Sequence, residues 1–261
     1  PNYGVFDEKR YFQPGNRPLV FALGKTVLGV NICEDIWMKE GVAKYQAEQG
    51  AKLIINISAS PFHSGKVILR EKMLKERVKE TNAYICYNNL VGGQDELVFD
   101  GTSMILDAKG KKVVTGKQFE EDLVLADLPI RGKNKSKARV GCKYYIRSDK
   151  FKSSRKPDLP KRYCKRLDRI SEIYNALVLG TRDYVRKNGF KKAVIGLSGG
   201  IDSSLTAVIA RDAIGKENVI GISMPSRYSS PETQSDVKVL ADNLGIRLIV
   251  VPIDTIFKVY L

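Results

Sequence analysis

Apolar positions in the first half of the chain fall into short runs separated by turn residues. Six runs predict β-strands: PLVFALG, KTVLGVNIC, AKLIINIS, NAYICYNNLV, ELVFDGTSMILDA and KKVVTG. Two stretches between them, VAKYQAEQG and VILREKMLKERVKETN, are predicted to be helical. Strands interleaved with helices in this way predict a layered α/β unit over residues 1–130.

The last third of the chain alternates strictly between predicted helices and strands. A long amphipathic helix, LDRISEIYNALVLGTRDYVRKNG, is ended by Asn188 and Gly189. After it, KKAVIGL, NVIGISMP and RLIVVPI predict strands, with helices predicted at SSLTAVIARDAIG and PETQSDVKVLADNLG. This order predicts βαβ units and a parallel sheet in a second domain over residues 166–261. Because only three such strands precede Leu261, we expect this domain to be incomplete.

Residues 131–165 form a basic segment between these two domains. The segment holds fourteen Lys or Arg against two Asp, and so accounts for most of the net charge of +15. Its Gly and Pro residues and its weak apolar periodicity predict a linker. Its charge, with Tyr144, Tyr145 and Phe151, keeps open a nucleic-acid-binding role. We favour that role less, because packing against acidic surfaces of sister subunits also explains the charge.

Composition excludes several classes of protein. Hydrophobic residues make up 43% and charged residues 28%, as in globular domains, and no apolar run approaches the ~20 residues of a membrane span. The N-terminus lacks both an initiating Met and the pattern of a signal peptide, so we expect the chain to begin inside a larger protein. Four cysteines without a CxxC pair argue against a disulfide scaffold or zinc ribbon, and we expect a cytoplasmic protein with reduced thiols.

The segment SGGIDSS, residues 198–204, lies between a predicted strand and a predicted helix. Two glycines let the backbone approach a ligand closely, and the helix N-terminus offers N–H groups to phosphate. Asp202 adds a carboxylate that suits Mg²⁺ beside phosphate oxygens. The chain has no GxxxxGK[ST], and GLSGG does not fit GxGxxG, so a Walker loop and a dinucleotide fingerprint are both excluded. A plain strand-to-helix turn with a serine N-cap is the simpler alternative.

The longer string VIGLSGGIDSSLTAVIA resembles the pyrophosphate loop of the ATP pyrophosphatase superfamily. The string GISMPSRYSSPETQSDVKVLADNLGI is similar to the segment that follows this loop in NAD synthetases. The resemblance implies a doubly wound parallel-sheet domain that cleaves ATP between its α and β phosphates, with Mg²⁺ held by Asp202. It places the 226–230 loop beside the nucleotide. It also implies a set of ATP-binding residues, with Met224 near the adenine: Gly196, Leu197, Ser198, Gly199, Gly200, Ile201, Asp202, Ser203, Ser204 and Met224.

Cys33 follows an apolar strand in the string GVNICEDIW. A lone cysteine at such a position is most often a buried structural residue. A nucleophilic thiolate here would need a cation to offset the acidic neighbours Glu34 and Asp35. His63, the single histidine of the chain, is the partner that residue types alone offer, so a Cys–His pair remains open.

Residues 1–130 resemble the nitrilase or carbon–nitrogen hydrolase fold, and in particular the glutaminase domain of glutamine-dependent NAD synthetases. The matching strings are PNYGVFDEKRYFQPG, GVNICEDIW, NISASPFHSGK and VGGQDELVFDG. The resemblance implies an αββα sandwich, incomplete at its N-terminus, and a Glu–Lys–Cys triad with Cys33 as the nucleophile. The Glu and the Lys are expected upstream of Pro1. His63 has no role in that triad.

Four further residues match the glutamine pocket of this family: Tyr3, Glu8, Ser58 and Lys66. The resemblance implies that Tyr3 lines the pocket and that Glu8 orients the upstream Lys. It also implies that Ser58 binds glutamine and that Lys66 holds the substrate carboxylate. The alternative is a solvated loop for Glu8 and Lys66, with core or turn packing for the other two.

Together the resemblances predict an enzyme that amidates deamido-NAD to NAD. Glutamine is hydrolysed through a Cys33 thioester, and ammonia then displaces AMP from the adenylated nicotinate carboxylate, after ATP has released pyrophosphate. The reaction is expected to require ATP as a substrate, Mg²⁺, and either glutamine or ammonia. We expect the protein to form a homo-oligomer and not to associate with a membrane. An alternative is another ATP-pyrophosphatase-type synthetase that forms GMP or asparagine. The nitrilase-like first domain argues against it.

Overall fold

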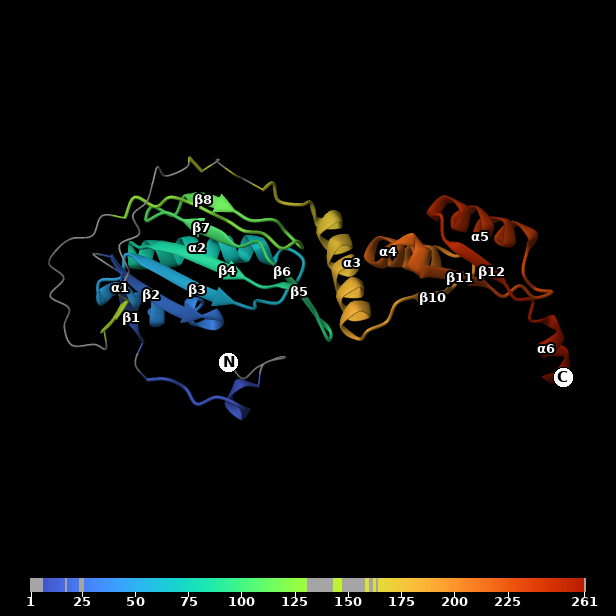
Figure 1. Ribbon diagram of the computed structural model, residues 1–261, viewed down its shortest axis with the longest axis horizontal. Coiled ribbons are helices and arrows are strands. Elements are labelled where there is room, and N and C mark those ends of the chain that lie inside the picture. Colours follow the sequence, from blue (N-terminus) through green and yellow to red (C-terminus); the bar gives the residue numbers. More distant parts are fainter. Residues whose placement is uncertain are drawn as a thin grey trace. The chain divides into compact units, whose positions relative to one another are not determined.

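The computed structural model describes residues 7–16, 18–23, 26–130, 143–146, 158–159, 162 and 164–260. The chain divides into two compact units, whose elements are labelled in Figure 1. Unit 1 comprises Pro1–Val91 and Phe99–Leu167, and unit 2 comprises Gly92–Val98 and Asp168–Leu261. Most of the basic segment 131–165 lies outside the described residues.

Unit 1 is built on a seven-stranded sheet in the order β8-β7-β4-β3-β2-β1-β9. Its centre is parallel, because β2 pairs with β3 and β3 with β4 in that sense, whereas β1, β7 and β8 pair antiparallel with their neighbours β2, β4 and β7. A separate hairpin pairs β5 with β6. The strands are β1 Val20–Leu23, β2 Thr26–Ile32, β3 Leu53–Ser58, β4 Tyr84–Asn89, β5 Val91–Gln94, β6 Leu97–Asp100, β7 Met104–Leu106, β8 Lys112–Thr115 and β9 Lys143–Ile146.

Helices α1 (Val42–Glu48) and α2 (Lys66–Thr81) share one hydrophobic core with this sheet. The helix side chains in that core are Ala43, Met73, Leu74 and Val78, and they pack with strand residues such as Ile54, Ile85 and Leu106. Helix α2 ends at Asn82, which adopts a left-handed conformation as amides do at this position. Two short 3-10 helices, Glu8–Arg10 and Cys33–Ile36, complete the regular elements described in unit 1.

The strand and helix pattern expected of unit 1 is found, with one difference inside residues 1–130 and one inside the expected linker. The run ELVFDGTSMILDA is two strands, because Gly101 and Thr102 both have positive φ angles (64° and 55°) and turn the chain between β6 and β7. Lys143–Ile146, inside the expected linker, forms strand β9 and pairs in parallel with β1. Its sequence, KYYI, holds residues of high β propensity that were too few to reveal a strand by periodicity.

Unit 2 contains a three-stranded parallel sheet in the order β10-β11-β12, as its alternating pattern predicts. The strands are β10 Ala193–Gly196, β11 Val219–Ser223 and β12 Arg247–Val250, and the helices are α3 Arg169–Lys187, α4 Ile201–Ile214, α5 Pro231–Leu244 and α6 Asp254–Tyr260, with a 3-10 turn at Lys216–Asn218. Helices α4 and α5 make the two crossovers and share one core that includes Ala207, Val219 and Val237. Helix α6 was not expected, because it lies at the end of the chain and is only seven residues long.

Side-chain caps mark the start of two helices of unit 2, α3 and α5. Asp168 accepts hydrogen bonds from the backbone N–H groups of Ile170 and Ser171, both at 3.0 Å, at the start of α3. Ser230 caps α5 by accepting from Thr233 N–H at 3.2 Å, with Pro231 at the first helical position. These caps place the N-terminus of α5 directly after the loop that follows β11.

The hairpin segment Gly92–Val98 belongs to unit 2 although its flanking residues belong to unit 1. Gly93 N–H donates to Asp183 Oδ2 at 2.8 Å, and Lys187 Nζ donates to Gly93 O at 2.6 Å. No sequence pattern predicts this association, because the two partners in each bond lie about ninety residues apart.

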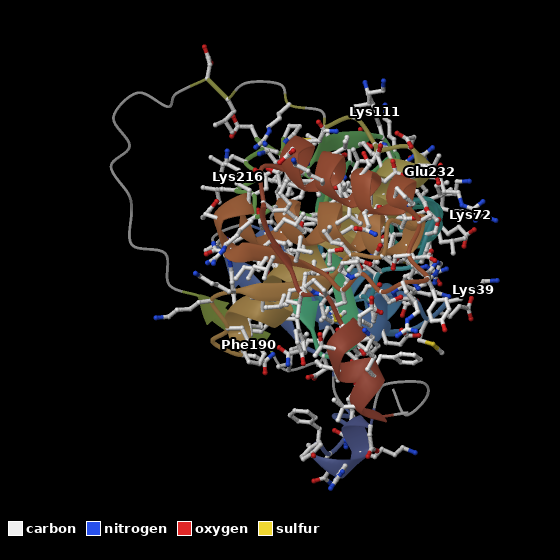
Figure 2. All side chains as sticks on the ribbon, turned by 90° about the vertical axis from the view of Figure 1, so that its right-hand side faces the viewer. Lys39, Lys72, Lys111, Phe190, Lys216 and Glu232 are labelled. Carbon is white, nitrogen blue, oxygen red and sulfur yellow. The ribbon has the colours of Figure 1, made fainter. Side chains whose placement is uncertain are left out.

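The described surface is highly charged. Lys39, Lys72 and Lys111 project outward from unit 1 (Figure 2). Within the described part of the chain, no helix has the length and apolar character that a bilayer crossing requires.

One ion pair lies wholly inside unit 1. Arg70 of α2 and Asp100 of β6 are both 0% exposed and form a bidentate pair, in which Nη1 donates to Asp100 Oδ2 at 3.0 Å and Nη2 donates to Oδ1. Thr102 Oγ1 also donates to Asp100 Oδ2 at 3.0 Å. A charge buried at this depth persists only when it is paired and hydrogen-bonded. The pair therefore ties α2 to the end of β6.

We predict that Asp100→Asn destabilises unit 1 by about 3–5 kcal/mol, because it leaves the Arg70 guanidinium buried without a counter-charge. Urea unfolding of the 261-residue chain, followed by the fluorescence of Trp37, measures this, since Trp37 packs against the core of unit 1. The double variant Arg70→Met/Asp100→Leu is the control and should recover most of the loss. A cost below ~1 kcal/mol for Asp100→Asn would contradict this view of the pair.

Candidate functional site

Cys33 lies at a sharp turn where strand β2 ends. Its φ angle is 46°, in the left-handed region that residues with a side chain rarely adopt. Two hydrogen bonds hold the turn: Ile32 N–H donates to Asp35 Oδ2 at 2.9 Å, and Asn56 Nδ2 donates to the Cys33 carbonyl at 3.3 Å. Asp35, expected only as an unfavourable acidic neighbour, is thus part of what fixes the turn.

A chain of buried amides stands behind this turn. Asn56 Nδ2 donates to Asn31 Oδ1 at 2.8 Å, and Asn31 Nδ2 donates to Gln46 Oε1 at 3.0 Å. Gln46 in turn donates to the backbone carbonyls of Val30 at 2.7 Å and Leu19 at 3.0 Å. All three amides are buried, so each bond lies in a medium where an unmade hydrogen bond is costly. The network therefore resists any rearrangement of the turn.

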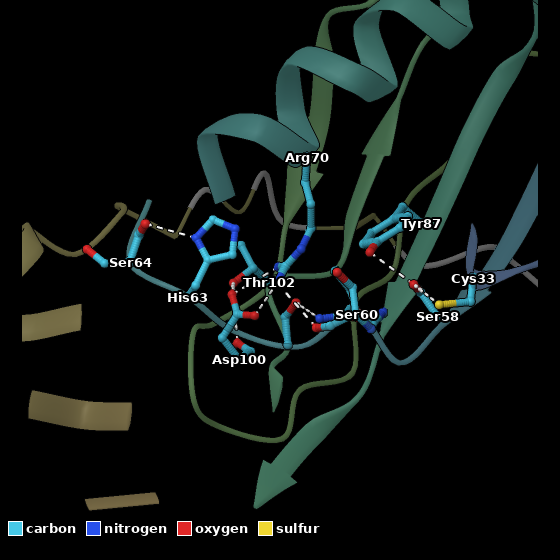
Figure 3. A network of polar contacts seen from close by, with 12 residues as sticks. Cys33, Ser58, Ser60, His63, Ser64, Arg70, Tyr87, Asp100 and Thr102 are labelled. Atoms are coloured by element: carbon cyan, nitrogen blue, oxygen red, sulfur yellow. Dashed lines mark hydrogen bonds and ion pairs between the residues drawn. The ribbon is translucent and has the colours of Figure 1, made fainter. Parts of the chain in front are cut away.

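The thiol of Cys33 meets the hydroxyl of Ser58. Strands β2 and β3 are parallel and pair Ile32, the last residue of β2, with Ile57. Cys33, directly after β2, therefore lies beside Ser58, the last residue of β3. Ser58 Oγ donates to Cys33 Sγ at 3.6 Å, a hydrogen-bond distance for sulfur (Figure 3). The sheet register thus brings together two residues that were expected at the same site.

Lys66, at the start of α2, is a cation near the thiol. Its Nζ lies 4.7 Å from the centre of the Trp37 ring. Burial, and then the nearby Arg70 guanidinium, lower the Lys66 pKa, whereas the charges of Glu34 and Cys33 act in the opposite direction. Lys66 is not among the residues that line the cavity beside Cys33, so its role in holding a substrate carboxylate stays a prediction.

A cavity of about 580 Å³ opens beside Cys33. Its size is ordinary for a small-molecule site. Cys33 shares its lining with Glu8, one of the predicted pocket residues, and with apolar side chains. The lining residues are Glu8, Lys9, Phe12, Gln13, Pro14, Ile32, Cys33, Glu34, Asp35 and Met38.

Two other residues considered from the sequence remain, of which only His63 is described by the structure. Tyr3 lies outside the described residues. His63 is exposed, its Nδ1 lies 3.1 Å from Ser64 O, and Figure 3 shows it on the far side of Arg70 and Asp100 from Cys33. The structure thus offers no support for the Cys–His pair.

The second candidate site is the loop between β10 and α4 in unit 2. Ser198 Oγ accepts from Gly200 N–H at 3.3 Å, and Ser203 Oγ accepts from Ser198 N–H at 3.3 Å. Ser203 Oγ also donates to Gly200 O at 3.0 Å. The N-cap of α4 is Gly200, without a side-chain cap, so the simple serine N-cap is wrong. A helix N-terminus without a side-chain cap can offer its N–H groups to an anion, and here it directly follows a serine-rich loop.

A small cavity of about 140 Å³ lies at the carboxyl ends of β10 and β11. Ser198 and Met224, both predicted to bind ATP, line it together. Ligands of open parallel sheets bind at this edge. The full lining is Leu197, Ser198, Ser223, Met224, Pro225, Ser229, Thr233, Gln234 and Val237. Asp202 lies nearby in the first turn of α4, with an exposed side chain.

The sequence reasoning missed the amides that hold the Cys33 turn. A usable signal was present, because Asn31 and Asn56 are each the single amide within an otherwise apolar run. An amide on a buried strand must have hydrogen-bond partners, which predicts a network even where the partners are unknown. Gln46 gave no such signal, since it lies on a helix where an exposed position was equally reasonable.

Unit 1 carries a cysteine beside a cavity at a strand end, and unit 2 carries a serine-rich loop before a helix N-terminus. Residues 1–132 match the carbon-nitrogen hydrolase family and residues 173–261 match the NAD synthase family. The first match spans half of the chain, and the chain belongs to the carbon-nitrogen hydrolase family.

Curated relatives match the chain from end to end. The glutamine-dependent NAD(+) synthetases of Aquifex aeolicus and Thermotoga maritima are each 46% identical to it, over 100% of this chain and 47% of their own length. The chain therefore spans about half the length of these relatives.

Solved structures give the same result for the fold. The glutamine-dependent NAD+ synthetase of Acinetobacter baumannii, in complex with adenosine diphosphate, is 36% identical with a TM-score of 0.82, covering 100% of this chain and 45% of that one. The enzyme from Cytophaga hutchinsonii has a TM-score of 0.76 at 21% identity, covering 100% and 47%, and supports the fold alone.

The tight packing of Gly199 generates a prediction for the phosphate loop. Its φ is 84°, and a Cβ there would lie 2.5 Å from Thr233 Cγ2 and 3.0 Å from Thr233 O. Gly199→Ala should therefore displace the loop from α5 and weaken ATP binding by about tenfold or more, as measured calorimetrically on protein from the complete reading frame. Gly189→Ala is the matched control, because Gly189 also has a positive φ (75°) but has open space around it. Equal ATP affinity in both variants would contradict the role of the close contact.

Proposed function

We propose that this chain is part of a glutamine-dependent NAD synthetase, which converts deamido-NAD to NAD with ATP and glutamine. The observation that carries the proposal is the presence, in one chain, of Cys33 beside a cavity and of a serine-rich phosphate loop. The names of the relatives and the two family matches support it.

In unit 1, the Cys33 thiolate attacks the side-chain amide carbon of glutamine. The tetrahedral species collapses with loss of ammonia and leaves a glutamyl thioester, which water hydrolyses to glutamate and free thiol. Lys66 holds the glutamine carboxylate and Ser58 contacts the substrate at the sulfur. Glu8 and Tyr3 shape the pocket, and the general base and the oxyanion-stabilising lysine are the Glu and Lys expected upstream.

In unit 2, the nicotinate carboxylate of deamido-NAD attacks the α-phosphorus of ATP and releases pyrophosphate. We assign the phosphates to the backbone of residues 197–201 and the hydroxyls of Ser198, Ser203 and Ser204. We assign the adenine to Met224, which lines the small cavity together with Ser198. Ammonia then attacks the adenylated carbonyl and displaces AMP. Ammonia must reach this site without protonation, so a sequestered path between the two reactions is required.

The residues present fit a magnesium ion brought with ATP. Mg²⁺ keeps several waters and takes one or two carboxylates together with substrate phosphates, and the exposed carboxylate of Asp202 beside the loop provides one. Among the described residues, no group of three His, Cys, Asp or Glu could hold a metal. We therefore assign Asp202 to a metal that neutralises phosphate charge when bound.

The setting of the enzyme is also part of the proposal. Cys33, Cys86 and Cys164 carry free thiols, which supports a reducing, cytoplasmic location. We further propose a homo-oligomer.

We predict that Cys33→Ala lowers glutamine-driven NAD formation by ~10³-fold or more in protein from the complete reading frame, because it removes the nucleophile. Ammonia-driven NAD formation should stay within about twofold, since it uses the phosphate loop alone. Both rates are measured by NAD production, with Cys164→Ala as the control for thiol loss elsewhere. Equal loss of the two activities would reject the division of chemistry between the units.

We predict that Asp202→Asn lowers ATP–pyrophosphate exchange in the presence of deamido-NAD by ~10²-fold with either nitrogen source, because it removes charge from the proposed metal ligand. Asp236→Asn is the control, since Asp236 is an exposed acid of α5 that does not line the cavity. An unchanged exchange rate in Asp202→Asn would show that Asp202 only stabilises the N-terminus of α4 and does not bind the metal.

A further inference from the structure

We propose that Tyr87 is a positioning residue of the glutaminase site, whose hydroxyl turns the Ser58 proton toward the sulfur of Cys33. The inference rests on the proposed function of unit 1 and adds to it a residue that does not touch the substrate. It makes Ser58 a hydrogen-bond donor to the thiolate as well as a contact for glutamine.

Two consecutive hydrogen bonds link Tyr87, Ser58 and Cys33 across adjacent elements of unit 1 (Figure 3). Tyr87 OH donates to Ser58 Oγ at 3.0 Å, and Ser58 Oγ donates to Cys33 Sγ at 3.6 Å. Strands β3 and β4 are parallel neighbours that pair Asn56 with Tyr87, so the tyrosine side chain reaches Ser58 at the carboxyl end of β3. The chain runs from the interior of unit 1 to the half-buried thiol.

The apolar surroundings of Tyr87 indicate that its hydroxyl serves a purpose other than packing. The side chain is 1% exposed and belongs to the apolar core with Ile85 and Met104, where a phenylalanine would pack as well. A hydroxyl buried there is costly unless it is hydrogen-bonded. The hydrogen bond that it donates to Ser58 satisfies it, and this bond lies one step from the reacting sulfur.

The direction of the two hydrogen bonds follows from the protons that Tyr87 and Ser58 carry. Burial raises the pKa of Tyr87 above its usual value, against the smaller effects of the Arg70 charge and the hydrogen bonds with Ser58 and Ser60. The phenol therefore keeps its proton at neutral pH and donates it. Ser58 has one proton and two acceptor sites, so an oxygen that accepts from Tyr87 is left to donate to the sulfur.

This arrangement assists the thiolate without transferring a proton. The charged sulfur gains a hydrogen bond from Ser58 before it attacks glutamine, and again when it leaves the thioester. The protons of Tyr87 and Ser58 stay in place throughout. The expected effect therefore falls on the reactivity of Cys33 and on the rate of turnover, and little on glutamine binding.

The test is Tyr87→Phe in protein from the complete reading frame, with Tyr84→Phe as the matched control from the same strand. Iodoacetamide alkylation of Cys33, followed by peptide mass spectrometry from pH 5 to 10, should show a rise in the midpoint of the pH profile. Alkylation at pH 7 should be about three- to tenfold slower. The glutaminase kcat should fall by a similar factor, with KM for glutamine within about twofold. Ammonia-driven NAD formation should not change.

A second variant makes the result independent of folding effects. Ser58→Ala should raise the same midpoint, and adding Tyr87→Phe to it should produce no further rise, because Tyr87 acts only through Ser58. An unchanged midpoint in Tyr87→Phe, or additive shifts in the double variant, would overturn the proposal. Alkylation needs no turnover, so it decides the role of Tyr87 even if the protein proves not to hydrolyse glutamine, which would overturn the proposed function alone.

Discussion

The left-handed turn at Cys33 is the constraint on which the arrangement of unit 1's site depends. A residue with a side chain pays about 1–3 kcal/mol to hold such a backbone conformation, which persists only when its surroundings leave no alternative. Here Asp35 accepts a hydrogen bond from the backbone N–H of Ile32, and Asn56 donates one to the carbonyl of Cys33. Asn31 and Gln46 extend this network away from the turn. The cost of the turn is offset by buried hydrogen bonds, and the result is a thiol aimed out of the sheet edge into a cavity.

Both units use the edge of a parallel sheet, where loops leave the carboxyl ends of the strands. In unit 1, β2 ends at Cys33 and its neighbour β3 ends at Ser58, so strand pairing sets the distance between thiol and hydroxyl. In unit 2, the loops after β10 and β11 bring Ser198 and Met224 to one cavity. Positions fixed by a sheet register move little, which suits reactions that depend on the placement of a nucleophile or a phosphate.

The sequence was informative where the chain is locally regular and misleading where partners are remote. Alternation located the strands that end at Cys33 and at the phosphate loop, and so the candidate chemistry, because strand ends are where such loops lie. Arg70 looked like one more charge on a polar helix, yet it is fully buried because Asp100, thirty residues away, pairs with it. Tyr87 was indistinguishable from a core aromatic, since its hydroxyl's partner Ser58 becomes adjacent only through the pairing of β3 with β4.

Among the described cysteines, Cys33 is the thiol that borders a cavity at a strand end. Cys86 lies on β4, where burial raises its pKa to about 11, so it stays protonated and unreactive at neutral pH. The most direct measurement treats protein from the complete reading frame with an electrophilic glutamine analogue and maps the adduct by peptide mass spectrometry. The account predicts one adduct per chain, on Cys33, with loss of glutamine-driven but not ammonia-driven NAD formation. An adduct on another residue that abolishes glutamine-driven formation while Cys33 remains free would contradict it.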